Sequence, residues 1–219
     1  MSKLLEPIEL VLHHDVLCGW SLIADARLRH LKEEMGDALR IELRPFPIRL
    51  DERVPSRREI QAETSALRKV AKEKEGKGIV ADLWRSNDPP RSSLPPLVAL
   101  EAARIIGGEA AQERLLRALR RAAFHHGVNV TRDDVLLELA ERCGIETARF
   151  ATALRAQGTR RLVTDAQDEA LFHGIDSVPS LVIGGEWLVA GVRSVDEYRD
   201  TIRRFGEQNG LFVPERMVH

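Results

Sequence analysis

The sequence predicts an α/β protein in which one mixed domain is interrupted by a helical insertion. Three observations predict it. The chain opens with strand, helix and strand patterns, residues 57 to 173 contain no convincing strand, and two short apolar runs followed by an amphipathic helix close the chain. We therefore assign residues 1–56 and 159–219 to one discontinuous domain and residues 57–158 to the insertion.

The first unit reads β-α-β. Residues 8–17, "IELVLHHDVL", alternate apolar and polar side chains at first, and we expect the strand to end near Val16. Residues 19–35 carry apolar side chains at helical spacing, and Gly36 closes that helix. Residues 39–48 alternate again and form the second strand. This order favours a parallel, right-handed unit.

The middle of the chain is helical. Residues 57–86 are highly charged with a helical pattern, and "NDPPRSSLPP" at 87–96 is a cluster of helix breakers. Pro95 and Pro96 suit the first turn of a helix that runs to Gly107. Beyond it, we expect helices at 109–126, 146–156 and 159–173. One more helix should follow a capping box formed by Thr131 and Asp134.

The end of the chain returns to strands. Two short apolar runs, "SLVI" and "WLVA", are separated by Gly184, Gly185 and Glu186, which is a hairpin signal. An amphipathic helix over about 194–208 follows.

Composition narrows the classes of partner. The 219 residues include 33 Lys and Arg against 34 Asp and Glu, so the basic excess of a nucleic-acid-binding protein is absent. The first residues lack an uninterrupted apolar run, no apolar run approaches transmembrane length, and there are only two cysteines. We expect a cytoplasmic protein without membrane or nucleic-acid partners.

A metal site is not expected. His13 and His14 are adjacent on a strand, so their side chains point to opposite faces, and a core or surface role fits them better than ligation of one ion.

The stretch "HDVLCGWS" at 14–21 places Cys18 where the first strand meets the first helix. Unpaired N–H groups at a helix N-terminus favour a thiolate, which is the nucleophilic form of cysteine. Gly19 would leave the backbone accessible, Trp20 would offer surface beside the sulfur, and the Ser21 hydroxyl could donate a hydrogen bond to it. Asp15 could tune the thiol or serve only the turn, and Cys18 itself could be an ordinary turn residue.

The second candidate motif is "SVPS" at 177–180. Proline interrupts a strand ladder, so Pro179 should sit at the start of a strand, and a cis Val178–Pro179 bond is expected there. Such a turn leaves the Val178 backbone free to pair with an extended substrate.

Together these motifs resemble the DsbA-like branch of the thioredoxin superfamily, and within it the cytosolic FrnE-type proteins. "DVLCGWS" is similar to the family pattern Asp-x-x-Cys-x-Trp-Cys, and "GIDSVPSLVIGGEWLVAG" at 174–191 is similar to the family's Val-Pro turn and hairpin. The resemblance spans nearly the whole chain and implies a thioredoxin-like fold with a helical insertion between its β-α-β and β-β-α halves. It also implies thiol-disulfide oxidoreductase activity.

This chain departs from the family at one decisive position. Ser21 stands where redox members carry a second cysteine, and Cys143 lies on an apolar helical stripe, where a thiol is usually inert. We therefore expect one-cysteine chemistry, in which Cys18 forms a mixed disulfide and external glutathione resolves it. No tightly bound cofactor is implied; the partners are thiol- or disulfide-containing proteins or glutathione.

Two alternatives stay open. The resemblance extends to 2-hydroxychromene-2-carboxylate isomerases and kappa-class glutathione transferases, which hold glutathione through a Ser-Asp pair where this chain has Val192 and Arg193. Ser92 and Ser93 resemble a turn that faces the active site in those isomerases, or they cap the next helix. The other alternative is a binding module whose Trp20 and Val178 face grips a peptide or a second copy of the chain as a homodimer.

Overall fold

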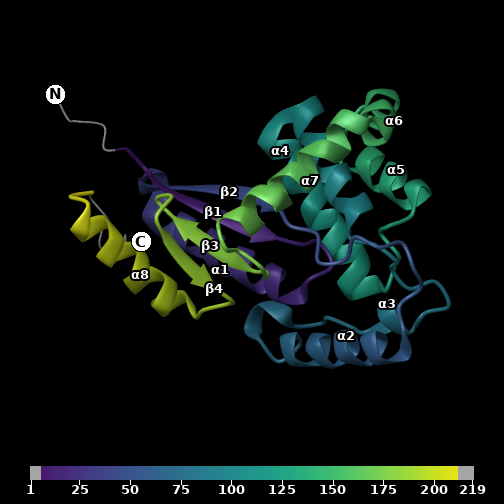
Figure 1. Cartoon of the computed structure of the whole chain (residues 1–219), viewed down its shortest axis with the longest axis horizontal. Coiled ribbons are helices and arrows are strands. Elements are labelled where there is room, and N and C mark those ends of the chain that lie inside the picture. Colours follow the sequence, from purple (N-terminus) through teal and green to yellow (C-terminus); the bar gives the residue numbers. More distant parts are fainter. Residues whose placement is uncertain (1–5, 212–219) are drawn as a thin grey trace.

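The computed structural model describes residues 6–211, so the two ends of the predicted discontinuous domain, residues 1–5 and 212–219, lie outside the described residues. Figure 1 shows the strands and helices, which with two short 3₁₀ turns follow one another in this order along the described residues. They are β1 (Ile8–His14), α1 (Gly19–Met35), η1 (Gly36–Ala38), β2 (Leu39–Pro45), α2 (Arg57–Val70), η2 (Lys74–Gly76), α3 (Asp82–Arg85), α4 (Leu94–His126), α5 (Asp133–Arg142), α6 (Thr147–Arg155), α7 (Gln157–Phe172), β3 (Ser180–Ile183), β4 (Trp187–Ala190) and α8 (Val195–Gln208).

The four strands form one mixed sheet in the order β2-β1-β3-β4. β1 pairs with β2 in parallel, while β3 pairs antiparallel with both β1 and β4. The α/β class, the parallel opening unit and the closing hairpin are confirmed, and so is the thioredoxin-like fold with a helical insertion.

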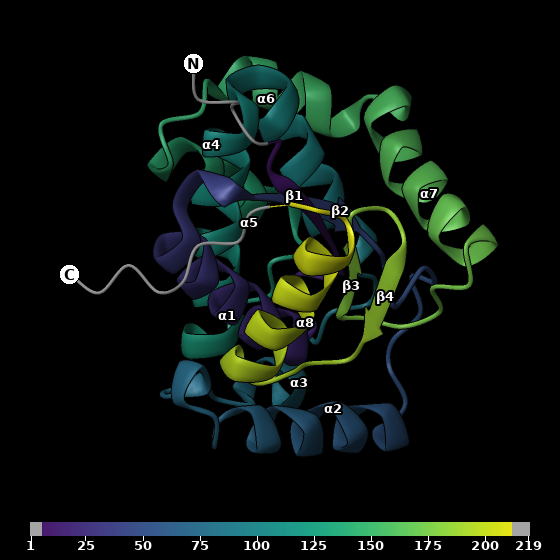
Figure 2. The ribbon, with the colours of Figure 1, turned by 90° about the vertical axis from the view of Figure 1, so that its left-hand side faces the viewer.

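Helices cover both faces of this sheet. α1 and α8 pack on one face, where Leu28 and Ile202 join Leu181 and Ile183 in a buried cluster. α7 packs on the other face through Ala170, towards which the intervening Val182 points. The side chains of β3 alternate between the two clusters as expected of a strand buried on both sides. Figure 2 shows α8 in front of the sheet and α7 to the right of it.

A second large buried cluster is centred on the long helix α4. α5, α6 and α7 all pack against α4, and the cluster extends to Leu17 in the loop after β1 and to Ile23 in α1. α4 kinks at Gly107 and Gly108, where the dihedrals are not helical, with Gly108 at φ 68°. The predicted break at Gly107 is therefore present, but as a kink inside one helix.

The helical expectation for 57–86 is met in part, because α2 ends at Val70 and turns lead to the short α3. One predicted detail of the insertion is wrong. The predicted capping box of Thr131 and Asp134 does not form, because the Thr131 hydroxyl donates to Oδ1 of Asn129 at 2.7 Å and α5 starts after Arg132 with no side-chain cap.

Candidate active site around Cys18

Cys18 is the residue that begins α1. It lies at the N-cap in an extended conformation, and its N–H donates to the Asp15 carbonyl at 3.3 Å. The Asp15 carboxylate accepts the Leu17 N–H at 2.7 Å and the Ile48 N–H at 2.8 Å, which fixes the loop after β1 against the loop after β2. The end of the first strand therefore positions the thiol at the carboxyl edge of the sheet.

The Val178–Pro179 turn faces this thiol. The peptide bond between the two residues is cis, and the Cys18 thiol donates to the Val178 carbonyl with the sulfur 3.8 Å from the oxygen. The turn is held by the Ser180 hydroxyl, which donates to Ser177, and by the Gly191 N–H, which donates to the Pro179 carbonyl, both at 2.8 Å. The fold thus joins the two motifs that the sequence singled out.

Cys18 opens onto a cavity of about 470 Å³. The α1 N-terminus, the loop after β2, helix α2, the end of α7 and the Val178 turn each form part of its wall. The lining residues are Cys18, Gly19, Trp20, Phe46, Pro47, Ile48, Glu63, Ala66, Leu67, Val70, Gln167, Leu171, Asp176, Ser177 and Val178. Three of the five walls, the loop after β2, α2 and α7, were not expected from the motifs.

Gly19 lines the cavity and also has a packing role. The residue is buried under α2. A Cβ at this position would lie 2.8 Å from Cδ2 of Leu67 and 3.2 Å from Cγ2 of Val70. The missing side chain therefore lets α2 approach the helix that carries the thiol.

The pKa of Cys18 also differs from expectation. Burial raises the pKa of the Cys18 thiol above its ordinary value, and hydrogen bonds from the Ser21 hydroxyl and from the Ser21 and Trp20 N–H groups oppose this only in part. The charge of Asp15 raises the pKa further. The helix N-terminus and Ser21 therefore moderate the effect of burial, and the resting thiol is protonated at neutral pH.

This direction sets an expected pH profile. In a Cys143→Ala background, alkylation of Cys18 should reach half its maximal rate above pH 8.5, the ordinary thiol pKa, and unfolding should shift the profile down to that value. Ser21→Ala should shift the folded profile higher still, because it removes a hydrogen bond that favours the thiolate. Iodoacetamide labelling followed by mass spectrometry measures this, and half-maximal labelling below pH 8.5 in the folded protein would contradict it.

Asp15 holds the loop after β1 in place and also affects the pKa of the Cys18 thiol. It is fully buried, and burial raises the pKa of its carboxyl group to about 6, although the N–H groups of Ile48 and Leu17 and the Ser93 hydroxyl act in the opposite direction. The carboxyl group of Asp15 is therefore mostly ionised at neutral pH, and its negative charge disfavours the Cys18 thiolate. The Ser93 hydroxyl also accepts the Arg49 N–H at 3.0 Å, makes no capping bond to α4, and does not line the cavity.

A buried ion pair lies behind the site, and the motifs did not indicate it. Arg120 of α4 donates to Asp25 of α1 at 2.6 Å, and each residue is 5 % exposed. Asp25 also accepts from Arg29 at 2.9 Å. The available signal was Asp25 itself, since an acid among the apolar positions of a buried helix face requires a cation.

The remaining candidates lie elsewhere. Cys143 is half-buried at the end of α5, and burial raises its pKa. Arg193 is exposed, donates to the Val192 carbonyl at 3.1 Å and does not line the cavity. His13 and His14 are both buried, and burial lowers the pKa of His13 to about 4 and that of His14 as well.

Two further properties concern the described part of the chain as a whole. None of its helices combines the length and the apolar character needed to cross a membrane. Within residues 6–211, no three His, Cys, Asp or Glu side chains gather closely enough to hold a metal ion.

Residues 9–203 match the family model of the DSBA-like thioredoxin domain, so the chain belongs to that family. A curated relative, the ClpXP adapter protein SpxH of Halalkalibacterium halodurans, is 33% identical over 101 residues, which are 46% of this chain and 32% of SpxH. The chain thus spans about a third of the length of this relative.

Solved structures share the fold over nearly the whole chain. A protein described as a disulfide isomerase from Nitrosomonas europaea has a TM-score of 0.80 at 18% identity, with 94% of this chain and 100% of that chain covered. The cytosolic disulfide reductase DsbM from Pseudomonas aeruginosa, solved with GSH, has a TM-score of 0.69 at 24% identity, with 92% and 98% covered.

Proposed function

We propose that this protein is a thiol-disulfide oxidoreductase of one-cysteine type, with Cys18 as its nucleophile. The position of Cys18 is the observation that best supports this proposal. Its sulfur lies at the N-cap of α1, beside the Val178 carbonyl and next to a cavity lined mainly by apolar residues. Ser21 occupies the place of a resolving thiol, and the other cysteine, Cys143, does not line this cavity. Membership of the DSBA-like family supports the reaction class.

The reaction is an exchange in two displacements. The Cys18 thiol loses its proton to solvent, and its thiolate attacks the glutathione sulfur of a protein–glutathione disulfide, which forms a Cys18–glutathione disulfide and releases the protein thiolate. A second glutathione thiolate then attacks the bound glutathione sulfur and releases Cys18. The substrate disulfide is reduced, and two glutathione units leave as one oxidised molecule.

The site residues have distinct roles in this proposal. Ser21 donates its hydroxyl hydrogen bond to the sulfur as negative charge develops, while its oxygen accepts the Asp15 N–H at 3.4 Å. When the thiol ionises, it no longer donates to the Val178 carbonyl, and that carbonyl becomes free to accept an N–H of the substrate. Pro179 holds the turn, and Trp20 provides surface for the substrate chain.

The rim of the cavity indicates what kind of polypeptide presents the disulfide. Ile48 and Leu171 line the cavity at 44% and 49% exposure, and Phe172 next to Leu171 is 86% exposed. Large apolar side chains gathered at the mouth of a site suit an unfolded or apolar segment. A reducing compartment such as the cytoplasm would supply the glutathione for the second step.

A glutathionylated peptide with apolar neighbours around its cysteine tests this proposal. The protein should accelerate release of the free peptide by glutathione, followed by chromatography, and Cys18→Ala should lower the catalysed rate at least about a hundredfold. Cys143→Ala is the matched control and should keep the rate. Equal rates for the wild type and Cys18→Ala would refute the proposal. A glutathione-dependent reaction that survives Cys18→Ser would favour the isomerase or transferase hypothesis.

A further inference from the structure

The outer edge of strand β2 is open. β2 is an outer strand of the sheet, and apart from its pairing with β1, no backbone group of residues 40–44 has a hydrogen-bond partner among the described residues. Unpaired N–H and C=O groups along a strand edge are a template for another extended chain. An edge of this kind is usually covered or blunted, so its surroundings decide what can reach it.

Two cavities flank this edge and share lining residues along it. One of about 480 Å³ lies between β2, α4 and α7, and one of about 840 Å³ lies between β2, α1 and α4. Both are lined by Arg40, Ile41, Leu43, Glu109 and Glu113. We call this pair of cavities the β2 trench.

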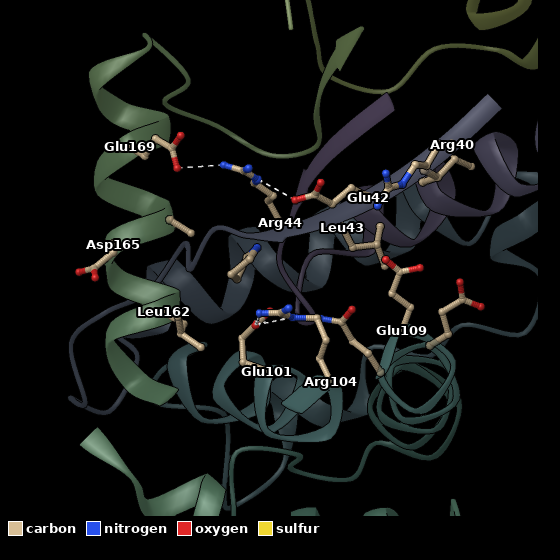
Figure 3. A pocket seen from close by; sticks show the side chains of 15 residues that line it. Arg40, Glu42, Leu43, Arg44, Glu101, Arg104, Glu109, Leu162, Asp165 and Glu169 are labelled. Carbon is tan, nitrogen blue, oxygen red and sulfur yellow. Dashed lines mark hydrogen bonds and ion pairs between the residues drawn. The ribbon is translucent and has the colours of Figure 1, made fainter. Parts of the chain in front are cut away.

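The walls of the β2 trench limit the size of its occupant. Figure 3 shows β2 crossing one side of the first cavity, with Glu101, Arg104 and Glu109 on α4 opposite and α7 at one end. The ion pair of Arg44 with Glu169, at 2.9 Å, ties β2 to α7 at that end. Helices α1, α4 and α7 flank the edge, which favours a single added strand over a second sheet. Five residues of β2 offer about 16 Å of edge.

The free charges of the β2 trench are negative. The six basic side chains that line it, Arg29, Lys32, Arg40, Arg44, Arg104 and Arg117, are all ion-paired. Glu109 and Asp165, in contrast, have no hydrogen-bond or ion-pair partner within residues 6–211. At the floor, the carboxylate of Glu101 is 5 % exposed and is held by Arg104 at 2.7 Å and Gln112 at 3.1 Å.

We propose that the β2 trench binds a short, extended, lysine- or arginine-bearing segment of another protein as an added strand on β2. Backbone hydrogen bonds to the open edge would supply affinity, and basic side chains facing Glu109 would supply selectivity. This inference does not rest on the proposed thiol chemistry, because the β2 trench shares no lining residue with the Cys18 cavity.

Fluorescence anisotropy with labelled five-residue peptides tests the proposal on the full chain. A Lys-Val-Lys-Val-Lys peptide should bind saturably and at least about tenfold more tightly than Glu-Val-Glu-Val-Glu. N-methylation of a backbone nitrogen keeps the charge of the peptide but removes a hydrogen-bond donor. Two series of peptides carry the methyl groups on one or the other set of alternate nitrogens. The series whose methylated nitrogens face β2 should bind at least about tenfold more weakly. The bound basic peptide should also slow hydrogen exchange of β2 amides.

Variants of the protein separate this site from general attraction. Glu109→Lys should weaken binding at least about tenfold, whereas Asp168→Lys, an exposed position on α7 outside the β2 trench, should change it less than about twofold. Cys18→Ala should bind the peptide normally. The proposal is overturned if neither series of N-methylated peptides loses affinity, if Asp168→Lys weakens binding as much as Glu109→Lys, or if the basic peptide does not bind.

Discussion

Ser21→Cys should convert the site into a dithiol that closes on itself. The Ser21 hydroxyl hydrogen-bonds to the Cys18 sulfur, so a thiol at position 21 would lie next to Cys18 at the start of α1. A resolving thiol in the same chain acts at a high effective concentration, and reduction of a protein disulfide without glutathione should rise at least about tenfold. Insulin reduction, with a dithiol reagent to regenerate the variant, measures this gain.

Thiol counting provides the control for this variant. After mild oxidation of Ser21→Cys and unfolding, only the Cys143 thiol should still react, and the intact mass should fall by two hydrogen atoms. The wild type should keep both of its cysteines reactive in the same treatment. If the variant retains all its thiols after oxidation, positions 18 and 21 are not placed as the structure shows.

Asp25→Ala should be the most destabilising single change considered for this protein. The substitution leaves the Arg120 guanidinium buried without its carboxylate partner. Because Nε and Nη2 of Arg120 have no hydrogen-bond partners among the described residues, no other group there compensates for the loss. Removal of one member of a buried pair costs about 3–5 kcal/mol of unfolding free energy. Urea denaturation followed by circular dichroism measures it.

Two further variants isolate the cause of that loss. Glu113→Ala removes the other carboxylate that contacts Arg29, but at a partly exposed position, and should cost less than about 1 kcal/mol. Replacing both buried partners, Asp25→Leu with Arg120→Met, should recover most of the stability, because no charge remains buried. A double variant as unstable as Asp25→Ala would show that packing, and not the uncompensated charge, dominates.

The arrangement of the site was predictable because it depends on backbone topology. A strand that ends before Cys18 and a proline that opens the hairpin at Pro179 must meet at one edge of the sheet once β1 and β3 pair. Hydrophobic periodicity is enough to place both elements. The juxtaposition of Cys18 and Val178 follows from those two patterns.

The electrostatics of the site were not predictable in the same way. A helix N-terminus is visible in the sequence, but the burial that raises the pKa of Cys18 depends on packing of α2, whose Leu67 and Val70 cover Gly19. That packing is a long-range property of the insertion. In the same way, nothing local distinguishes Arg120 from its neighbours Arg117 and Arg121, and only the tertiary contact with Asp25 selects it.

The most direct test of the central claim is intact mass after incubation with oxidised glutathione at a pH above the ordinary thiol value, for the wild type, Cys18→Ala and Cys143→Ala. One-cysteine chemistry at Cys18 predicts a single glutathione adduct on the wild type and on Cys143→Ala, none on Cys18→Ala, and removal of the adduct by reduced glutathione. An adduct that persists in Cys18→Ala, or the absence of any adduct on the wild type, would contradict it.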